Sequence, residues 1–170
     1  MTALKCPHER RLWLLGATLA AALLGAGCST KQAAPETRFV LLDGSQTSTE
    51  AFKGKVVLVN FWATSCVTCV AEMPKLVQTH QQFHERGYET LAVAMSYDPP
   101  AYVVNFSQTR QLPFKVAIDN TGAVAKAWGD IKITPTTYLL NKRGEIVKQF
   151  VGEPDFAALQ QLIEKLLAEG

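Results

Sequence analysis

The chain has 170 residues, which is enough for one domain of ordinary size with its own hydrophobic core. Its 17 Lys and Arg residues against 15 Asp and Glu residues give a formal net charge of +2, too small to indicate a nucleic-acid partner. The excess lies within the first 28 residues, so the remainder of the chain is neutral and its charge favours no class of partner.

The first 27 residues have the pattern of a secretory signal peptide. A basic stretch ending in Arg10-Arg11 precedes thirteen mostly apolar residues, 12–24, fewer than the roughly 20 that a helix needs to span a bilayer. The next residues, GAGC at 25–28, resemble the lipobox of bacterial lipoproteins, in which the cysteine is acylated and starts the mature protein. The resemblance implies lipidation of Cys28, with Gly25 where the lipobox usually has leucine. Cleavage as a plain signal peptide and retention as an uncleaved anchor are the alternatives.

Residues 28–38 are polar, contain Pro35 and show no apolar period, so we expect a tether that leads to a domain of residues 39–170. At about 3.3 Å per extended residue, residues 29–38 would hold the domain within roughly 33 Å of its membrane. By the lipoprotein resemblance, Ser29 favours sorting to the outer membrane, which implies a lipid-anchored protein in the periplasm. That compartment permits disulfides.

The domain alternates apolar strands with amphipathic helices. KVVLVNF, residues 55–61, is typical of a strand buried on both faces of a parallel sheet. In residues 66–86 the apolar side chains recur at helical spacing, and Gly87 is a natural helix end. We expect strands at 39–42, 55–61, 90–95, 114–118, 136–140 and 146–151, and helices at 66–86, 99–111, 122–128 and 156–167. This order predicts an α/β fold with a central mixed β-sheet flanked by helices.

The cysteines narrow the chemistry of the domain. Of the four, Cys6 lies in the leader and Cys28 in the lipobox, which leaves Cys66 and Cys69 as a Cys-x-x-Cys pair. A structural zinc site needs four ligands. His80 lies about 16 Å from Cys69 along the same predicted helix, at about 1.5 Å per residue, so it cannot join the two thiols in such a site. A structural disulfide that closes so short a loop removes little unfolded-state entropy. The remaining interpretation is a pair that cycles between dithiol and disulfide.

The position of the pair supports this redox interpretation. Cys66 follows a buried strand and starts a helix, where unpaired N–H groups and the macrodipole favour a thiolate by up to about 2 kcal/mol, roughly one pKa unit. Cys69 lies one turn further in. Because the thiolate is the attacking species, we expect Cys66 to be the nucleophile and Cys69 the resolving thiol. The chemistry needs no metal and no cofactor beyond the redox-active disulfide itself.

The segment NFWATSCVTCVAEMP resembles the active site of the thioredoxin superfamily, and within it the TlpA/ResA-like membrane-tethered thiol-disulfide oxidoreductases. Pro74 matches the family's helix-kinking proline. The segment ITPTTY, residues 133–138, resembles the one that carries the cis-proline facing the cysteines. The resemblance implies a thioredoxin-like fold, a cis bond before Pro135, and substrate binding through the backbone of Thr134, which pairs with an extended peptide.

Two further residues near the motif are candidates for the site. The resembled family often carries an acid at the position of Glu72 for proton handling, whereas thioredoxins use a buried acid at the position of Asn60. Glu72 is therefore the candidate proton acceptor, and a solvated glutamate in the first turns of the helix is the alternative. Trp62 is either a packing residue or a substrate contact. Ser65 and the pair Val67-Thr68 depart from the family's usual residues at positions that tune potential and partner choice.

The resemblance implies a reductase of disulfides in periplasmic proteins, supplied by a membrane electron donor of the DsbD/CcdA type. A thiol oxidase or isomerase would use the same residues and is the alternative. A peroxiredoxin fits less well, because its motif would need proline at Val59 and a hydroxyl residue at Ala63. A Sco-type copper carrier also fits less well, since it uses Cys-x-x-x-Cys and a distant histidine, and no histidine follows His84.

Overall fold

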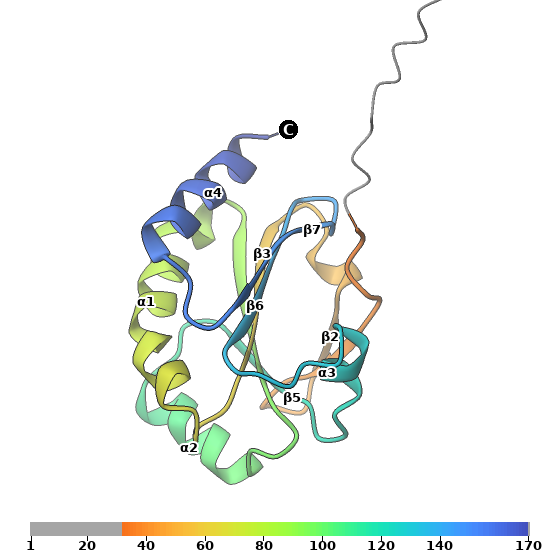
Figure 1. The fold of residues 1–170 in the computed structure, drawn as a ribbon, viewed down its shortest axis with the longest axis vertical. Coiled ribbons are helices and arrows are strands. Elements are labelled where there is room, and N and C mark those ends of the chain that lie inside the picture. The colour runs from red at the N-terminus through yellow and green to blue at the C-terminus, as the bar shows by residue number, and fades with distance from the viewer. Residues whose placement is uncertain (1–31, 170) are drawn as a thin grey trace, which may run out of the picture.

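The computed structural model describes residues 32–169 (Figure 1). Its main sheet has five strands in the order β5-β4-β3-β6-β7. The strands are β3 (Val56–Trp62), β4 (Tyr88–Ala94), β5 (Lys115–Ile118), β6 (Thr136–Leu140) and β7 (Ile146–Val151). β3, β4 and β5 run parallel, and β6 and β7 are antiparallel additions at one side. The predicted mixed sheet is therefore confirmed.

Helices cover both faces of this sheet. α1 (Val67–Phe83), α2 (Pro100–Thr109) and α4 (Phe156–Ala168) lie on one face, at the left of Figure 1. The short helix α3 (Ala123–Ala127) and a small antiparallel pair, β1 (Arg38–Val40) and β2 (Gln46–Ser48), lie on the other. Two single-turn 3-10 helices, η1 (Glu50–Phe52) and η2 (His84–Arg86), complete the chain. Sequence reasoning missed β2, a three-residue polar strand outside the main sheet.

The central strand β3 explains why two cores form. Every residue of β3 is buried, and its apolar side chains alternate between the core beneath α1, α2 and α4 and the core beneath α3 and β1. Strands buried on both faces must be apolar almost throughout, which is the pattern that the sequence shows. The exception is Asn60, a fully buried polar residue in the middle of the strand.

The segment predicted as a tether, residues 28–38, makes hydrogen bonds with the domain over residues 32–37. The Ile146 N–H donates to the Gln32 carbonyl at 2.7 Å, and the Ala34 N–H donates to the Gly144 carbonyl at 2.9 Å. The indole N–H of Trp128 donates to Thr37 at 3.0 Å. Backbone pairing with the β6–β7 hairpin thus holds a segment that composition alone suggested to be loose.

The predictions for the signal peptide and for Cys28 concern residues outside the described range. Between residues 32 and 169, no helix is long and apolar enough to cross a membrane.

The topology gathers three loops at one end of the sheet. Because β3 and β4 are parallel, the loops that follow them lie side by side. β6 runs antiparallel to β3, so the loop that leads into β6 meets them at the same end. This end holds the Cys-x-x-Cys segment, and we refer to it as the disulfide pole.

Candidate active site

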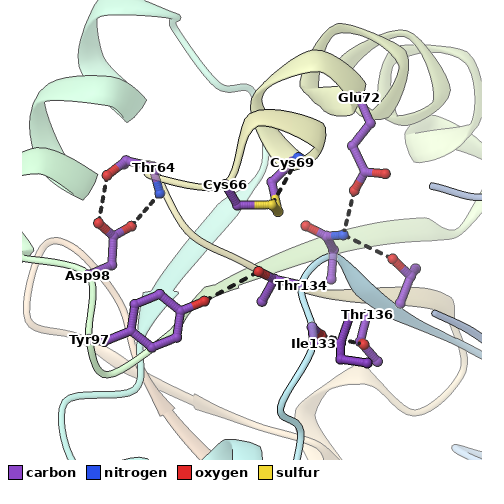
Figure 2. Close-up of a disulfide and its surroundings, with 11 residues drawn as sticks. Thr64, Cys66, Cys69, Glu72, Tyr97, Asp98, Ile133, Thr134 and Thr136 are labelled. Atoms are coloured by element: carbon purple, nitrogen blue, oxygen red, sulfur yellow. Dashed lines mark hydrogen bonds between the residues drawn. A yellow bond between two sulfur atoms is a disulfide. The ribbon is translucent and has the colours of Figure 1, made fainter. Parts of the chain in front are cut away.

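Cys66 and Cys69 form a disulfide at the start of α1 (Figure 2). Cys66 is the N-cap of the helix, and its sulfur accepts a hydrogen bond of 3.2 Å from the backbone N–H of Cys69. Cys66 is half-buried, whereas Cys69 has no exposed surface. The more accessible sulfur is therefore the one that receives the helix N–H group, which suits a nucleophile with a buried resolving partner.

The loop that leads into β6 contributes the second part of the site. The Thr134–Pro135 peptide bond is cis, as the resemblance implied. Pro135 is buried and Thr134 is partly exposed, and Figure 2 shows Thr134 below the disulfide. The hydroxyl of Thr136 donates to the Ile133 carbonyl at 2.7 Å and so closes the turn locally. The structure therefore brings the two predicted segments together at the disulfide pole.

Glu72 lies one helical turn beyond Cys69 and is completely buried. This burial overturns the alternative of a solvated glutamate. One carboxylate oxygen accepts a hydrogen bond of 2.9 Å from the Asn60 amide, which donates another of 2.9 Å to the hydroxyl of Thr137. Figure 2 shows the carboxylate turned toward the strand that leads to the cysteines.

Burial controls the acidity of Glu72. Desolvation raises its pKa from 4.5 to about 7, the Asn60 hydrogen bond opposes this shift, and the charge of Glu153 adds to it. The second carboxylate oxygen has no hydrogen-bond partner among the described residues. A proton can therefore be added there without breaking an existing bond, at a pH where thiols exchange protons.

Trp62 is placed in the core instead of on the binding surface. The side chain has no exposed area, and its ring lies 5.1 Å from the ring of Phe106. Helix α2 covers the indole, so Trp62 presents no surface to a substrate in this structure. The burial favours the packing role.

Sequence reasoning missed two residues of the β4–α2 loop, Tyr97 and Asp98. Asp98 accepts hydrogen bonds from the backbone N–H and the hydroxyl of Thr64, each at 2.6 Å. The hydroxyls of Tyr97 and Thr134 are 3.3 Å apart. The signal that could have found them was topological, because both follow a strand parallel to the one that leads to Cys66.

Comparison with known proteins places this site in a family. The model of the family described as Redoxin matches residues 29–163. The chain belongs to the Redoxin family. Among curated relatives of this Redoxin protein, the thiol-disulfide oxidoreductase ResA of Bacillus thuringiensis subsp. konkukian is 34% identical over 125 residues, covering 74% of this chain and 71% of that protein. ResA of Bacillus subtilis strain 168 is 33% identical over 140 residues, covering 81% and 77%.

Solved structures agree with the thioredoxin-like fold. A thioredoxin from Neisseria meningitidis superposes with a TM-score of 0.76 at 38% identity, covering 82% of this chain and 93% of that one. A thiol:disulfide interchange protein from Chlorobium tepidum superposes with a TM-score of 0.74 at 26% identity, covering 81% and 97%. With its Cys-x-x-Cys disulfide in place, this Redoxin-family protein is a thiol-disulfide oxidoreductase.

Proposed function

We propose that this protein reduces disulfides in other proteins outside the cytoplasm, with Cys66 as nucleophile and Cys69 as resolving thiol. The observation that carries the proposal is the arrangement of the pair. A half-buried sulfur caps a helix and faces the cis-proline loop, and its partner is fully buried one turn behind it. An incoming disulfide can reach the first sulfur, and the second is close enough to release the product.

The reaction starts from the dithiol form. The Cys66 thiolate attacks one sulfur of the substrate disulfide, and the other substrate sulfur leaves as a thiolate that takes up a proton. The mixed disulfide is then resolved when Cys69 loses its proton and attacks the sulfur of Cys66. The second substrate sulfur leaves and is protonated, so the substrate gains two electrons and two protons, and the protein becomes the disulfide seen here.

Glu72 is the proposed acceptor of the Cys69 proton. It lies one turn from Cys69, and its pKa of about 7 leaves it part ionised and part protonated near neutral pH. A base with a pKa near the working pH combines the correct protonation state with sufficient proton affinity. In the reverse step it returns the proton, so the same residue serves both directions.

Thr134 is proposed to bind the substrate through its backbone. Thr134 is partly exposed beside the disulfide, and the next residue, Pro135, is buried and joined to it by a cis peptide bond, which fixes the backbone at this point. An extended substrate segment paired with this backbone would carry its cysteine to Cys66.

The cellular setting is part of the same proposal. The leader pattern of residues 1–27 and the lipobox at Cys28 support a lipid-anchored protein of the periplasm, with the outer membrane favoured by Ser29. The dithiol form must be regenerated there, and a membrane electron donor of the DsbD/CcdA type would supply the two electrons. Labelling with a radioactive fatty acid tests the anchor, because Cys28→Ala should abolish incorporation.

Two measurements test the catalytic proposal. A Cys69→Ala variant should retain substrates on Cys66 as mixed disulfides in cells, and the matched Cys66→Ala variant should retain none. Equilibration of the purified protein with glutathione then gives its potential. A value as oxidising as about −120 mV, typical of strong thiol oxidants, would contradict the reductase direction and favour the oxidase. Absence of any trapped protein together with an unreactive Cys66 would contradict both.

A further inference from the structure

The loop between β4 and α2 sends two successive side chains into the two halves of the site (Figure 2). Asp98 reaches Thr64, which precedes the nucleophilic cysteine by two residues. Tyr97 reaches Thr134, which precedes the cis-proline. The cysteine loop and the cis-proline loop are far apart in sequence, so this one loop connects the segment that reacts to the segment that binds.

The contact of Asp98 is the stronger of the two. Its side chain is 3% exposed, and both carboxylate oxygens accept from the same residue, one from the N–H and one from the hydroxyl of Thr64, at 2.6 Å each. Among the residues that the structure describes, no lysine, arginine or histidine pairs with this carboxylate. Hydrogen bonds to an ionised acceptor are about twice as strong as neutral ones, so Thr64 is firmly held.

The position of Thr64 determines the position of the nucleophilic Cys66. Thr64 lies inside the turn in which the Cys66 N–H donates to the Ala63 carbonyl at 3.1 Å. The same turn sets the direction in which the Cys66 sulfur meets the first N–H groups of α1. A loosened turn would move the sulfur out of line with those groups and weaken the stabilisation of the thiolate.

The contact of Tyr97 concerns the substrate instead of the thiolate. Tyr97 is 59% exposed, and its hydroxyl lies 3.3 Å from that of Thr134. A polypeptide laid against the backbone of Thr134 passes this ring, whereas a small disulfide can meet Cys66 without touching it. Deleting the hydroxyl releases the Thr134 side chain but leaves the cysteine turn and the Asp98 contact in place.

We propose that Tyr97 and Asp98 together set the position of the cysteine turn relative to the substrate-binding backbone. Asp98 is a positioning residue that acts on Cys66 through Thr64, and Tyr97 is a specificity-determining residue for polypeptide substrates. This inference rests on the proposed reduction of protein disulfides.

Alkylation of the reduced protein tests Asp98. Mass spectrometry of the Cys66 peptide gives the rate with iodoacetamide from pH 5 to pH 9. Asp98→Asn should slow alkylation at pH 6 by about three- to tenfold and move the profile to higher pH, since a helix N-terminus contributes roughly one pKa unit. Thr64→Val should act in the same direction, and Thr64→Ser, which keeps both donors, should restore the wild-type profile.

Faster alkylation in Asp98→Asn would show that the carboxylate acts by its negative charge, and this would overturn the positioning role. An unchanged profile in both Asp98→Asn and Thr64→Val would overturn it as well. The profile is measured on folded protein, and recovery of the wild-type profile in Thr64→Ser, which keeps both donors, separates the expected result from a general loss of stability.

Two oxidants of different size test Tyr97. The second-order oxidation rate of the reduced protein is measured with insulin and with hydroxyethyl disulfide. Tyr97→Phe should lower the insulin rate by about two- to fivefold, the effect expected of one neutral hydrogen bond, and leave the rate with the small disulfide unchanged. Tyr102→Phe is the matched control, because Tyr102 is 64% exposed on α2 and forms no hydrogen bond through its hydroxyl in the described structure; it should change neither rate.

An equal change with both oxidants, or no change with either, would overturn the specificity role. A wild-type protein that reacts with neither oxidant would instead contradict the proposed function. The failures of the two proposals are thus distinguishable in one set of measurements.

Discussion

The Asn60 amide donates a hydrogen bond of 2.9 Å to the buried carboxylate of Glu72. The two residues come from different elements, Asn60 from the centre of β3 and Glu72 from the second turn of α1. This pairing holds the titratable carboxylate of Glu72 behind the disulfide, buried between the sheet and helix α1. Three of the predictions below concern it.

Replacing Glu72 by Gln should slow resolution of the mixed disulfide. The variant keeps an oxygen that can accept from Asn60 but cannot take up a proton, and general bases contribute about 100-fold or more. Because Glu72 must be ionised to act, the wild-type rate of resolution should rise with pH through about 7, and this limb should be missing in the variant. Stopped-flow measurement of product release after mixing with substrate gives both the rate of resolution and its dependence on pH. A variant with the wild-type pH profile would remove Glu72 from the mechanism.

The same residue should make the oxidised protein less stable as pH rises. The folded pKa of Glu72, about 7, lies above its ordinary value of 4.5, so the folded state binds more protons than the unfolded state between these pH values. The free energy of unfolding should therefore fall from pH 4.5 to pH 7 by about 3 kcal/mol from this group. Glu72→Gln should flatten the curve and be the more stable protein at pH 8. Urea unfolding of the wild-type and Glu72→Gln proteins from pH 4.5 to pH 8 measures this dependence. The same change of unfolding free energy with pH in both proteins would contradict the prediction.

Asn60→Leu should shift the acidity of Glu72 further upward. The Asn60 hydrogen bond lowers the pKa of Glu72 against the effect of burial, and leucine has a similar volume without a donor. The rising limb of the resolution rate should move to higher pH by up to about one unit. Thr137→Val is the control, since it removes an acceptor of Asn60 but leaves the bond to Glu72. A shift of equal size in both variants would indicate a general loosening of the strand instead.

Much of the fold could be predicted from the sequence, because strands buried on both faces and a long amphipathic helix leave strong periodic patterns. The position of Cys66 as helix cap followed from the same pattern. The burial of Glu72 could not be predicted: a glutamate in a second helical turn is ordinarily solvated, and only the Asn60 amide on the adjoining strand makes its burial tolerable. Asp98 carries no local sequence signal, because its contact with Thr64 depends on the parallel pairing of β3 and β4, and only an argument from topology could have pointed to it.

The segment before β1 gives a fourth prediction. A chain that starts at residue 38 lacks the hydrogen bonds that Gln32, Ala34 and Thr37 make with the rest of the domain. It also leaves the indole N–H of Trp128, a buried residue, without its acceptor. Compared with a chain that starts at residue 32, it should lose about 2 kcal/mol of unfolding free energy. Equal thermal and urea midpoints for the two chains would show that the segment is a passive tether after all.

Under the proposed anchor at Cys28, the docking of this segment would determine which way the protein faces. Gln32 pairs with Ile146 and Ala33 bridges to Glu145, both next to the turn of the β6–β7 hairpin. The turn between β6 and β7 lies at the end of the sheet where β3 begins, opposite the end from which the chain leads into α1 (Figure 1). Cys66 follows that second end, and the 7 residues of β3 at about 3.3 Å each place the entry of the chain roughly 20 Å from the disulfide. A protein held at a membrane by residues upstream of Gln32 would turn its hairpin to the lipid and its reactive sulfur to the solvent. Soluble substrates could then dock without approaching the bilayer, whereas an electron donor fixed in a membrane would need a domain that extends past the height of the sheet.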